Sequence, residues 1–169
     1  PGSGSKYQRI LAAVDVDSSP TEGCGSLIMQ LATSLKEREN AELDIVHAWH
    51  LQYESMFRNG RFKLTDAELH ALLSRKVERH EAKLEELLQP YGIAIDDKNV
   101  KMVKGKAAES INQIARRNNS DIIVMGTVGR VGLPGFFIGN TAEEIIQTTN
   151  CSVLAVKPVG FKSPVTQPI

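Results

Sequence analysis

The sequence has little of what marks secreted, membrane or nucleic-acid-binding proteins. It has 2 cysteines in 169 residues and no CxxC pair, so we expect no disulfide framework and a reduced, cytoplasmic compartment. No apolar run approaches the ~20 residues that a membrane-spanning helix needs. Lysine and arginine number 20, as do aspartate and glutamate, so no overall charge attracts the chain to nucleic acid or to a membrane.

The chain also lacks two common phosphate-binding motifs. A Walker A loop needs a lysine after its glycines, and no lysine lies between Lys106 and Lys157. A Rossmann fingerprint needs Gly-x-Gly-x-x-Gly after the first strand, but residues 15–20 contain no glycine. Both families are excluded.

Apolar runs and helical patterns alternate along the chain. The apolar runs predict strands at residues 10–14, 43–49, 99–103, 121–125 and 152–156. Helical spacing predicts helices at residues 20–39, 66–88, 107–118 and 141–149. Ser19 and Pro20 indicate one helix start, and Thr65 with Glu68 forms a capping box at another. The alternation predicts an α/β fold, a doubly wound parallel sheet of five strands with helices on both faces.

The remaining segments show no such pattern. Residues 50–64 predict a loop over the ligand edge of the sheet. Residues 1–5 have the composition of a flexible cloning remnant. We expect one domain over residues 6–158 and a flexible tail at residues 159–169, which is rich in proline and has no core pattern.

A glycine-rich stretch follows the strand predicted at residues 121–125. Glycines stand at positions 126, 129, 132, 135 and 139, where they let backbone approach a ligand and adopt positive φ. Asn140 with Glu143 predicts an N-cap and a capping box at the next helix, whose first amides attract anions. The stretch therefore predicts a phosphate cradle, although such glycines can also do no more than relieve steric strain.

The glycines and two apolar runs together carry a family resemblance. Gly126, Gly129, Gly139 and Asn140 follow the pattern Gly-x2-Gly-x9-Gly-Asn. With the runs at 10–15 and 151–156, they make residues 7–158 resemble the universal stress protein family. The resemblance implies strand order 3-2-1-4-5 and a ligand crevice between the first and fourth strands.

The resemblance also implies a ligand and a role. It implies a domain that binds an adenine nucleotide, such as ATP with or without Mg²⁺, as a sensor or regulator in the stress response rather than as an enzyme. Asp15 and main chain near Ala48 would hold the adenosine end, and the glycine loop the phosphates. From the residues alone, Asp15 can instead cap the turn at Ser18 and Ser19, and Arg130 can either add charge beside a phosphate or be solvated. The residues implied to line the site are Asp15, Ala48, Met125, Gly126, Gly129, Arg130, Gly139, Asn140 and Thr141.

Two alternative functions remain open. Nucleotide-binding members of the family usually carry Ser or Thr where this chain has Asn140, and its motif details look most like the second domain of tandem members. This favours an interaction module, without nucleotide or with another ligand, that works by dimerisation or pairing with a sister domain through the strand at 152–156. An ATPase or nucleotidyl-transfer enzyme would need a base or a metal-held water, but no acidic residue lies between Asp121 and Glu143.

The histidines predict little chemistry. His47 and His50 lie on one strand at a spacing that turns them to opposite faces, so we expect no metal site. His70 and His80 fall on the long helix and are expected at its surface or at the boundary of the core. No Ser, His and Asp set can be assembled from the sequence, so we expect no nucleophilic catalysis.

Overall fold

The computed structural model describes residues 7–17, 24–60, 63–127 and 138–158. The strands within these ranges are β1 (Arg9–Ala13), β2 (Glu42–Trp49), β3 (Val100–Lys104), β4 (Ile122–Gly126) and β5 (Ser152–Val156). The helices are α1 (Gly25–Glu39), α2 (Glu54–Asn59), α3 (Asp66–Leu88), the short 3-10 helix η1 (Gln89–Tyr91), α4 (Ala107–Arg117) and α5 (Asn140–Thr148).

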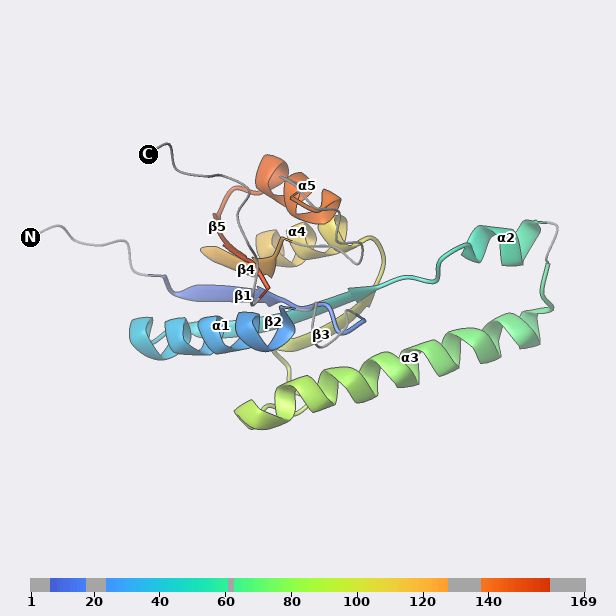
Figure 1. The fold of residues 1–169 in the computed structure, drawn as a ribbon, viewed down its shortest axis with the longest axis horizontal. Coiled ribbons are helices and arrows are strands. Elements are labelled where there is room, and N and C mark those ends of the chain that lie inside the picture. Colours follow the sequence, from blue (N-terminus) through green and yellow to red (C-terminus); the bar gives the residue numbers. More distant parts are fainter. Residues whose placement is uncertain (1–6, 18–23, 61–62, 128–137, 159–169) are drawn as a thin grey trace, which may run out of the picture.

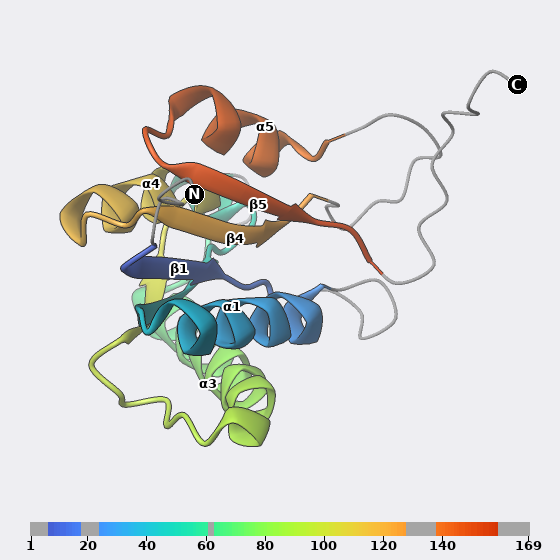
Figure 2. The same ribbon diagram turned by 90° about the vertical axis from the view of Figure 1, so that its left-hand side faces the viewer.

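The strands form one parallel sheet in the order β3-β2-β1-β4-β5. Figures 1 and 2 show α1 and α3 on one face of the sheet and α4 and α5 on the other. The predicted fold class and strand order are therefore confirmed. Because all strands are parallel, their carboxyl ends lie along one edge of the sheet, where ligands bind in folds of this kind.

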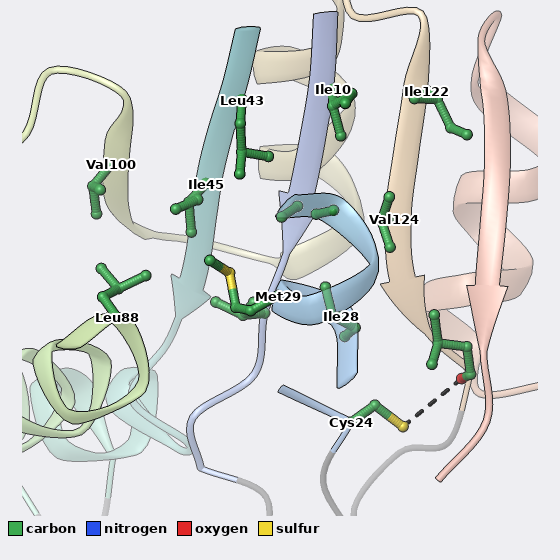
Figure 3. Packing of buried hydrophobic residues seen from close by; sticks show 14 of the residues in the cluster. Ile10, Cys24, Ile28, Met29, Leu43, Ile45, Leu88, Val100, Ile122 and Val124 are labelled. Carbon is green, nitrogen blue, oxygen red and sulfur yellow. Dashed lines mark hydrogen bonds between the residues drawn. The ribbon is translucent and has the colours of Figure 1, made fainter. Parts of the chain in front are cut away.

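Side chains of the central strand divide between two cores because successive residues of a strand point to opposite faces. Ile10 and Ala12 pack with α1 and α3, whereas Leu11 and Ala13 pack with α4 and α5. Figure 3 shows the first core, which includes Ile28 and Met29 of α1, Leu88 of α3, and Leu43, Ile45, Val100, Ile122 and Val124 of the sheet. This two-sided burial explains why β1 and β4 are nearly continuous apolar runs.

The long helix α3 begins as its sequence predicts. Thr65 Oγ1 accepts a hydrogen bond from the Glu68 amide, and the Glu68 carboxylate accepts one from the Thr65 amide at 2.8 Å. This reciprocal capping box satisfies two of the amides that a helix start leaves open. The helix ends at Leu88, before Pro90.

Two predicted segments differ from the structure. Helix α1 begins at Gly25, after a Cys24 N-cap, rather than at Pro20; Ser19 and Pro20 lie outside the described residues. Residues 54–59 form helix α2 rather than a loop, and α2 lies beyond the sheet near the start of α3 (Figure 1). Glu54 stabilises α2 through an i,i+4 pair with Arg58 at 2.7 Å, and it also binds Lys104 at the end of β3 at 2.8 Å. Residues 54–59 have no apolar period, which is the signal from which the other helices were predicted.

Within the described residues, no helix has both the length and the apolar character that crossing a membrane requires.

Candidate functional site

The ends of β1 and β4 lie side by side at the carboxyl edge of the sheet. Ala13 of β1 is in register with Met125 of β4, so Asp15 and Gly126 follow at the same edge. The Val14 amide continues the ladder by donating to the Val46 carbonyl oxygen at 3.0 Å. The structure therefore brings these two predicted site residues, 111 positions apart in the sequence, to one place.

Thr127 joins the two ends of the predicted glycine loop. Its amide donates to the Val156 carbonyl oxygen of β5 at 3.0 Å, and its own carbonyl oxygen accepts from the Gly139 amide at 2.7 Å. The Thr127 side chain is buried and also donates to Val156 O, at 3.3 Å. These bonds hold the amino end of α5 against the carboxyl end of β4. Gly129 and Arg130 lie outside the described residues.

Helix α5 begins differently from its prediction. Gly139, not Asn140, is the N-cap, and the Gly139 carbonyl oxygen accepts the first helical bond, from the Glu143 amide at 3.0 Å. Asn140 is the first helical residue, its side chain is exposed, and this helix start has no side-chain cap. The predicted Asn140 cap and its capping box with Glu143 are therefore wrong. Because Gly139 at φ −58° and ψ 149° already turns the chain into the helix, the Asn140 side chain is not used for that purpose.

The two glycines of the predicted loop that the structure describes, Gly126 and Gly139, do not adopt positive φ. Gly139 has φ −58°, and Gly126 is not among the residues with positive φ. A Cβ built on Gly126 would lie 3.4 Å from the Cβ of Cys24, at the limit of ordinary contact. Cys24 is buried, its thiol lies 3.8 Å from Val156 O (Figure 3), and burial raises its pKa against the opposing charge of Lys157. A Cβ at position 126 would therefore be in ordinary van der Waals contact with the start of α1, so packing alone does not require glycine there.

The other predicted site residues differ in what they can offer a ligand. Asp15 is exposed, and its Oδ1 accepts from the Asp17 amide at 3.0 Å. Ala48 is half-buried on β2, in register with Val103 of β3. The Met125 side chain is buried in the core under α4 and α5, so only its main chain faces the edge. Thr141 is half-buried in the first turn of α5.

A buried histidine pair stands behind the same edge, and sequence reasoning missed it. His47 of β2 and His80 of α3 are exposed by 0% and 1%. His47 Nε2 lies 2.6 Å from His80 Nδ1, and His47 Nδ1 lies 3.0 Å from the Val14 carbonyl oxygen. The rings stack with centroids 4.9 Å apart, and Trp49 lies against His80 with its centroid at 5.8 Å. The prediction that His80 lies at the surface or at the boundary of the core is wrong, whereas His70 is exposed as expected.

Asp17 completes this cluster. Its carboxylate lies 3.3 Å from His80 Nε2, and the cations of α3 surround it, Arg79 at 3.3 Å, Lys83 at 3.5 Å and Lys76 at 3.7 Å. The His80–Asp17 contact has the distance of an ion pair but not the alignment of a hydrogen bond. Burial lowers the pKa of His80 from 6.5 to about 4, although the Asp17 carboxylate opposes that shift.

Both histidines carried a sequence signal. His80 continues the spacing of Leu69, Leu73, Val77, Leu84 and Leu88 on the apolar stripe of α3, and His47 alternates with Leu43, Ile45 and Trp49 on β2. Histidine as a residue type suggests a surface position, but the place of both histidines in the apolar pattern indicates the core.

Within the part of the chain that the structure describes, no group of three or more His, Cys, Asp or Glu side chains is placed to hold a metal ion.

The sheet is doubly wound, and β4 lies beside the central strand β1. Sheets of this order define a class of α/β proteins in which ligands bind at the carboxyl edge. The chain belongs to the universal stress protein family, whose model matches residues 6–157.

Individual relatives agree with this assignment. Universal stress protein E from Photorhabdus laumondii is 38% identical over 87 residues, which are 52% of this chain and 27% of the relative. A protein of unknown function from Pseudomonas aeruginosa PAO1 superposes with TM-score 0.68 at 28% identity, over 90% of this chain and 48% of that one. A universal stress protein solved in complex with cAMP superposes with TM-score 0.50 at 19% identity, over 90% and 98% of the two chains, and shows the fold alone. The chain thus spans about a quarter of the first relative's length and about half of the second's.

Proposed function

We propose that this chain binds an adenine nucleotide at the carboxyl edge between β1 and β4 and acts in the stress response as a sensor or regulator. The observation that carries the proposal is the 2.7 Å bond from the Gly139 amide to the Thr127 carbonyl oxygen. It sets the amino end of α5 beside the carboxyl end of β4, so a ligand at this edge meets the first amides of a helix. Those amides have no acceptor within the helix and attract phosphate.

Each end of the nucleotide has residues that suit it. The first turn of α5 offers the amides of residues 140–142 and the exposed Asn140 side chain to the phosphates. Asp15 offers its carboxylate to ribose or adenine, and Ala48 offers main chain. Membership of the family supports the proposal, and the relative solved with cAMP holds an adenine nucleotide on the same fold. Gly129 and Arg130 belong to the proposed site by their place in the motif.

Calorimetry with ATP tests this function directly. We expect micromolar affinity, about −8 kcal/mol, for protein from which carried nucleotide has been removed and identified by mass spectrometry. No binding by the wild type, together with no nucleotide released on denaturation, would reject the proposal.

We expect any hydrolysis of the bound nucleotide to be slow. Between Asp121 and Glu143 the sequence has no carboxylate to hold Mg²⁺ or activate water, and it has no Walker lysine. Turnover of roughly 1 per second or faster that follows the protein through purification would show that the chain is an enzyme.

A second candidate function rests on β5. This strand pairs only with β4 in the described sheet, and its residues Ser152, Leu154 and Ala155 are exposed. An apolar strand at a sheet edge accepts another strand, and the relatives are longer than this chain. We propose that β5 pairs with a second copy or with a sister domain.

Sedimentation tests this pairing. A charge at Leu154 (Leu154→Lys) should convert a dimer to a monomer, because a charged edge resists strand pairing. Ile146→Lys is the matched control, because Ile146 is exposed by 47% and Leu154 by 37%. It should leave the dimer intact, since Ile146 lies on α5 and not on the strand edge. A wild type that stays monomeric at high concentration would rule out pairing between copies.

A further inference from the structure

The peptide between β1 and Asp15 is tied to the sheet on both of its sides. The Val14 amide donates to Val46 O at 3.0 Å, and the Val14 carbonyl oxygen accepts from His47 Nδ1, also at 3.0 Å. Both partners belong to β2. Asp15 follows directly and receives the Asp17 amide on its Oδ1. The position of Asp15 therefore depends on a bond from a buried imidazole.

The carbonyl oxygen of Val14 determines which ring nitrogens carry hydrogen. A carbonyl only accepts, so His47 Nδ1 must carry a hydrogen, and in a neutral ring His47 Nε2 then has none. His47 Nε2 therefore accepts, and His80 Nδ1, at 2.6 Å, donates. A neutral His80 is left with a bare Nε2, and this atom faces Asp17 without a hydrogen bond. Burial, which lowers the pKa of His80, agrees with a neutral ring.

We propose that His47 and His80 are positioning residues of the nucleotide site, chained as two Nδ1–H tautomers that hold the Val14 carbonyl oxygen and with it Asp15. The proposal rests on the nucleotide function proposed above. His80 acts through His47, because its Nδ1–H keeps His47 Nε2 an acceptor and so keeps the hydrogen of His47 on Nδ1. The far end of the segment is held separately, by the contacts of Asp17 with Arg79, Lys76 and Lys83 of α3.

Several charged groups lie near His47 and His80 and affect the protonation of the two rings. Asp17 faces His80 from the segment after β1, and Lys76, Arg79 and Lys83 face Asp17 from α3. At the ends of β2 and β3, the Lys104 ammonium lies 5.9 Å from the centre of the Trp49 ring that covers His80, and it binds Glu54 of α2.

Nitrogen NMR of the histidine rings tests the tautomers in the wild type without any nucleotide. We expect both His47 and His80 to be neutral with hydrogen on Nδ1 at pH 7. Hydrogen on Nε2 of His47, or a charged pair at pH 7, would overturn the proposal.

Two substitutions at His47 separate positioning from packing. His47→Asn keeps an amide donor at the place of Nδ1 and should hold Val14, whereas His47→Leu fills the space without a donor. Losing one hydrogen bond should weaken ATP binding about three- to tenfold in His47→Leu, with His47→Asn within about twofold of the wild type. The Asp17 amide, which binds Asp15, should exchange faster with solvent in His47→Leu alone. His70→Leu, at an exposed position of α3, is the control and should leave affinity unchanged.

The outcomes separate this proposal from the function on which it rests. Equal losses in both His47 variants, or no loss in either, would reject positioning even where the wild type binds ATP. If the wild type binds no ATP, the nucleotide function fails. The histidine tautomers and the exchange rate of the Asp17 amide still decide whether His47 and His80 hold Asp15 in place. If His47→Leu does not fold, the histidine tautomers and the exchange rate of the Asp17 amide, measured in the wild type and in His47→Asn, decide whether the proposal holds.

Discussion

The carboxyl edge of the sheet has two regions that treat polar groups in opposite ways. At the start of α5, the Asn140 side chain is exposed and the helix has no side-chain cap. Behind the end of β1, His47 and His80 are fully buried, and their ring nitrogens face each other, a carbonyl oxygen and a carboxylate.

The difference separates a surface that can bind a ligand from the structure that supports it. Hydrogen-bonding groups without a partner among the described residues are available for an anion, and the first amides of α5 are of this kind. Buried polar groups need partners within the protein, because an unpaired one costs about 1–3 kcal/mol, and three of the four ring nitrogens of His47 and His80 have such a partner. Changes at the histidines should therefore affect stability first, and changes at the start of α5 should affect binding first.

The largest effect that this comparison predicts is a loss of stability in acid. The unfolded chain has a histidine pKa near 6.5, whereas burial lowers that of folded His80 to about 4. Between these values the unfolded state binds more protons, so the stability present above pH 6.5 is lost as the pH falls toward 4. A shift of this size corresponds to about 3 kcal/mol.

Urea unfolding at pH 7 and pH 4 measures this loss. Carboxylates titrate in the same range, so the difference between the wild type and His80→Gln isolates the histidine. His80→Gln should lose about 3 kcal/mol less than the wild type, whereas His70→Gln should behave as the wild type does. The single tryptophan, Trp49, lies against His80 and gives a fluorescence signal for the same transition. Parallel pH profiles for the wild type and His80→Gln would contradict the prediction.

The second prediction concerns Gly139 and should alter binding more than stability. A branched side chain in Gly139→Val blocks close approach of a phosphate, so ATP affinity should fall by at least ~1.4 kcal/mol, or tenfold. The backbone angles of Gly139, φ −58° and ψ 149°, are allowed for valine. Calorimetry with ATP and thermal unfolding of the same sample test both parts. If the free energy of unfolding falls by as much as the free energy of ATP binding does, Gly139 has a structural role instead.

Most of the fold could be predicted because its strands and helices follow from the regular spacing of apolar residues along the sequence. Ile10 and Ala12 alternate with Leu11 and Ala13 between two cores, and this alternation produces the apolar run from which β1 was predicted. The Thr65 capping box was also predictable, because both of its partners lie within one helical turn. Helix α2 was not, because an ion pair with Lys104 of a distant strand joins its Glu54 to the rest of the protein.

The candidate site was less predictable, because its details depend on competition between neighbouring groups. Asn140 has the residue type of an N-cap, yet the backbone of Gly139 takes that role one position earlier. His80 has the residue type of a surface position, yet its place on the apolar stripe of α3 buries it against His47. The contact of Val14 with His47 joins two strands and appears in no local pattern.

The last and smallest effect is expected at Asn140, where stability and ATP affinity should change in opposite directions. Because the Asn140 side chain does not cap α5, Asn140→Ser should alter stability by no more than about 0.5 kcal/mol. Asn140→Asp adds a negative charge to the first turn of the helix, which should stabilise the fold by about 0.3–1 kcal/mol. The same charge repels phosphate, so ATP affinity should fall about tenfold in Asn140→Asp and stay near the wild type in Asn140→Ser.

Chemical unfolding and ATP calorimetry on the two Asn140 variants measure these opposite changes. High salt should reduce both effects of the Asp variant, because the charge lies at an exposed position where ions screen it. If Asn140→Asp gains stability and keeps its affinity for ATP, then the phosphates do not lie at the start of α5. The proposed site would then have to be moved away from this helix, even if the wild type binds ATP.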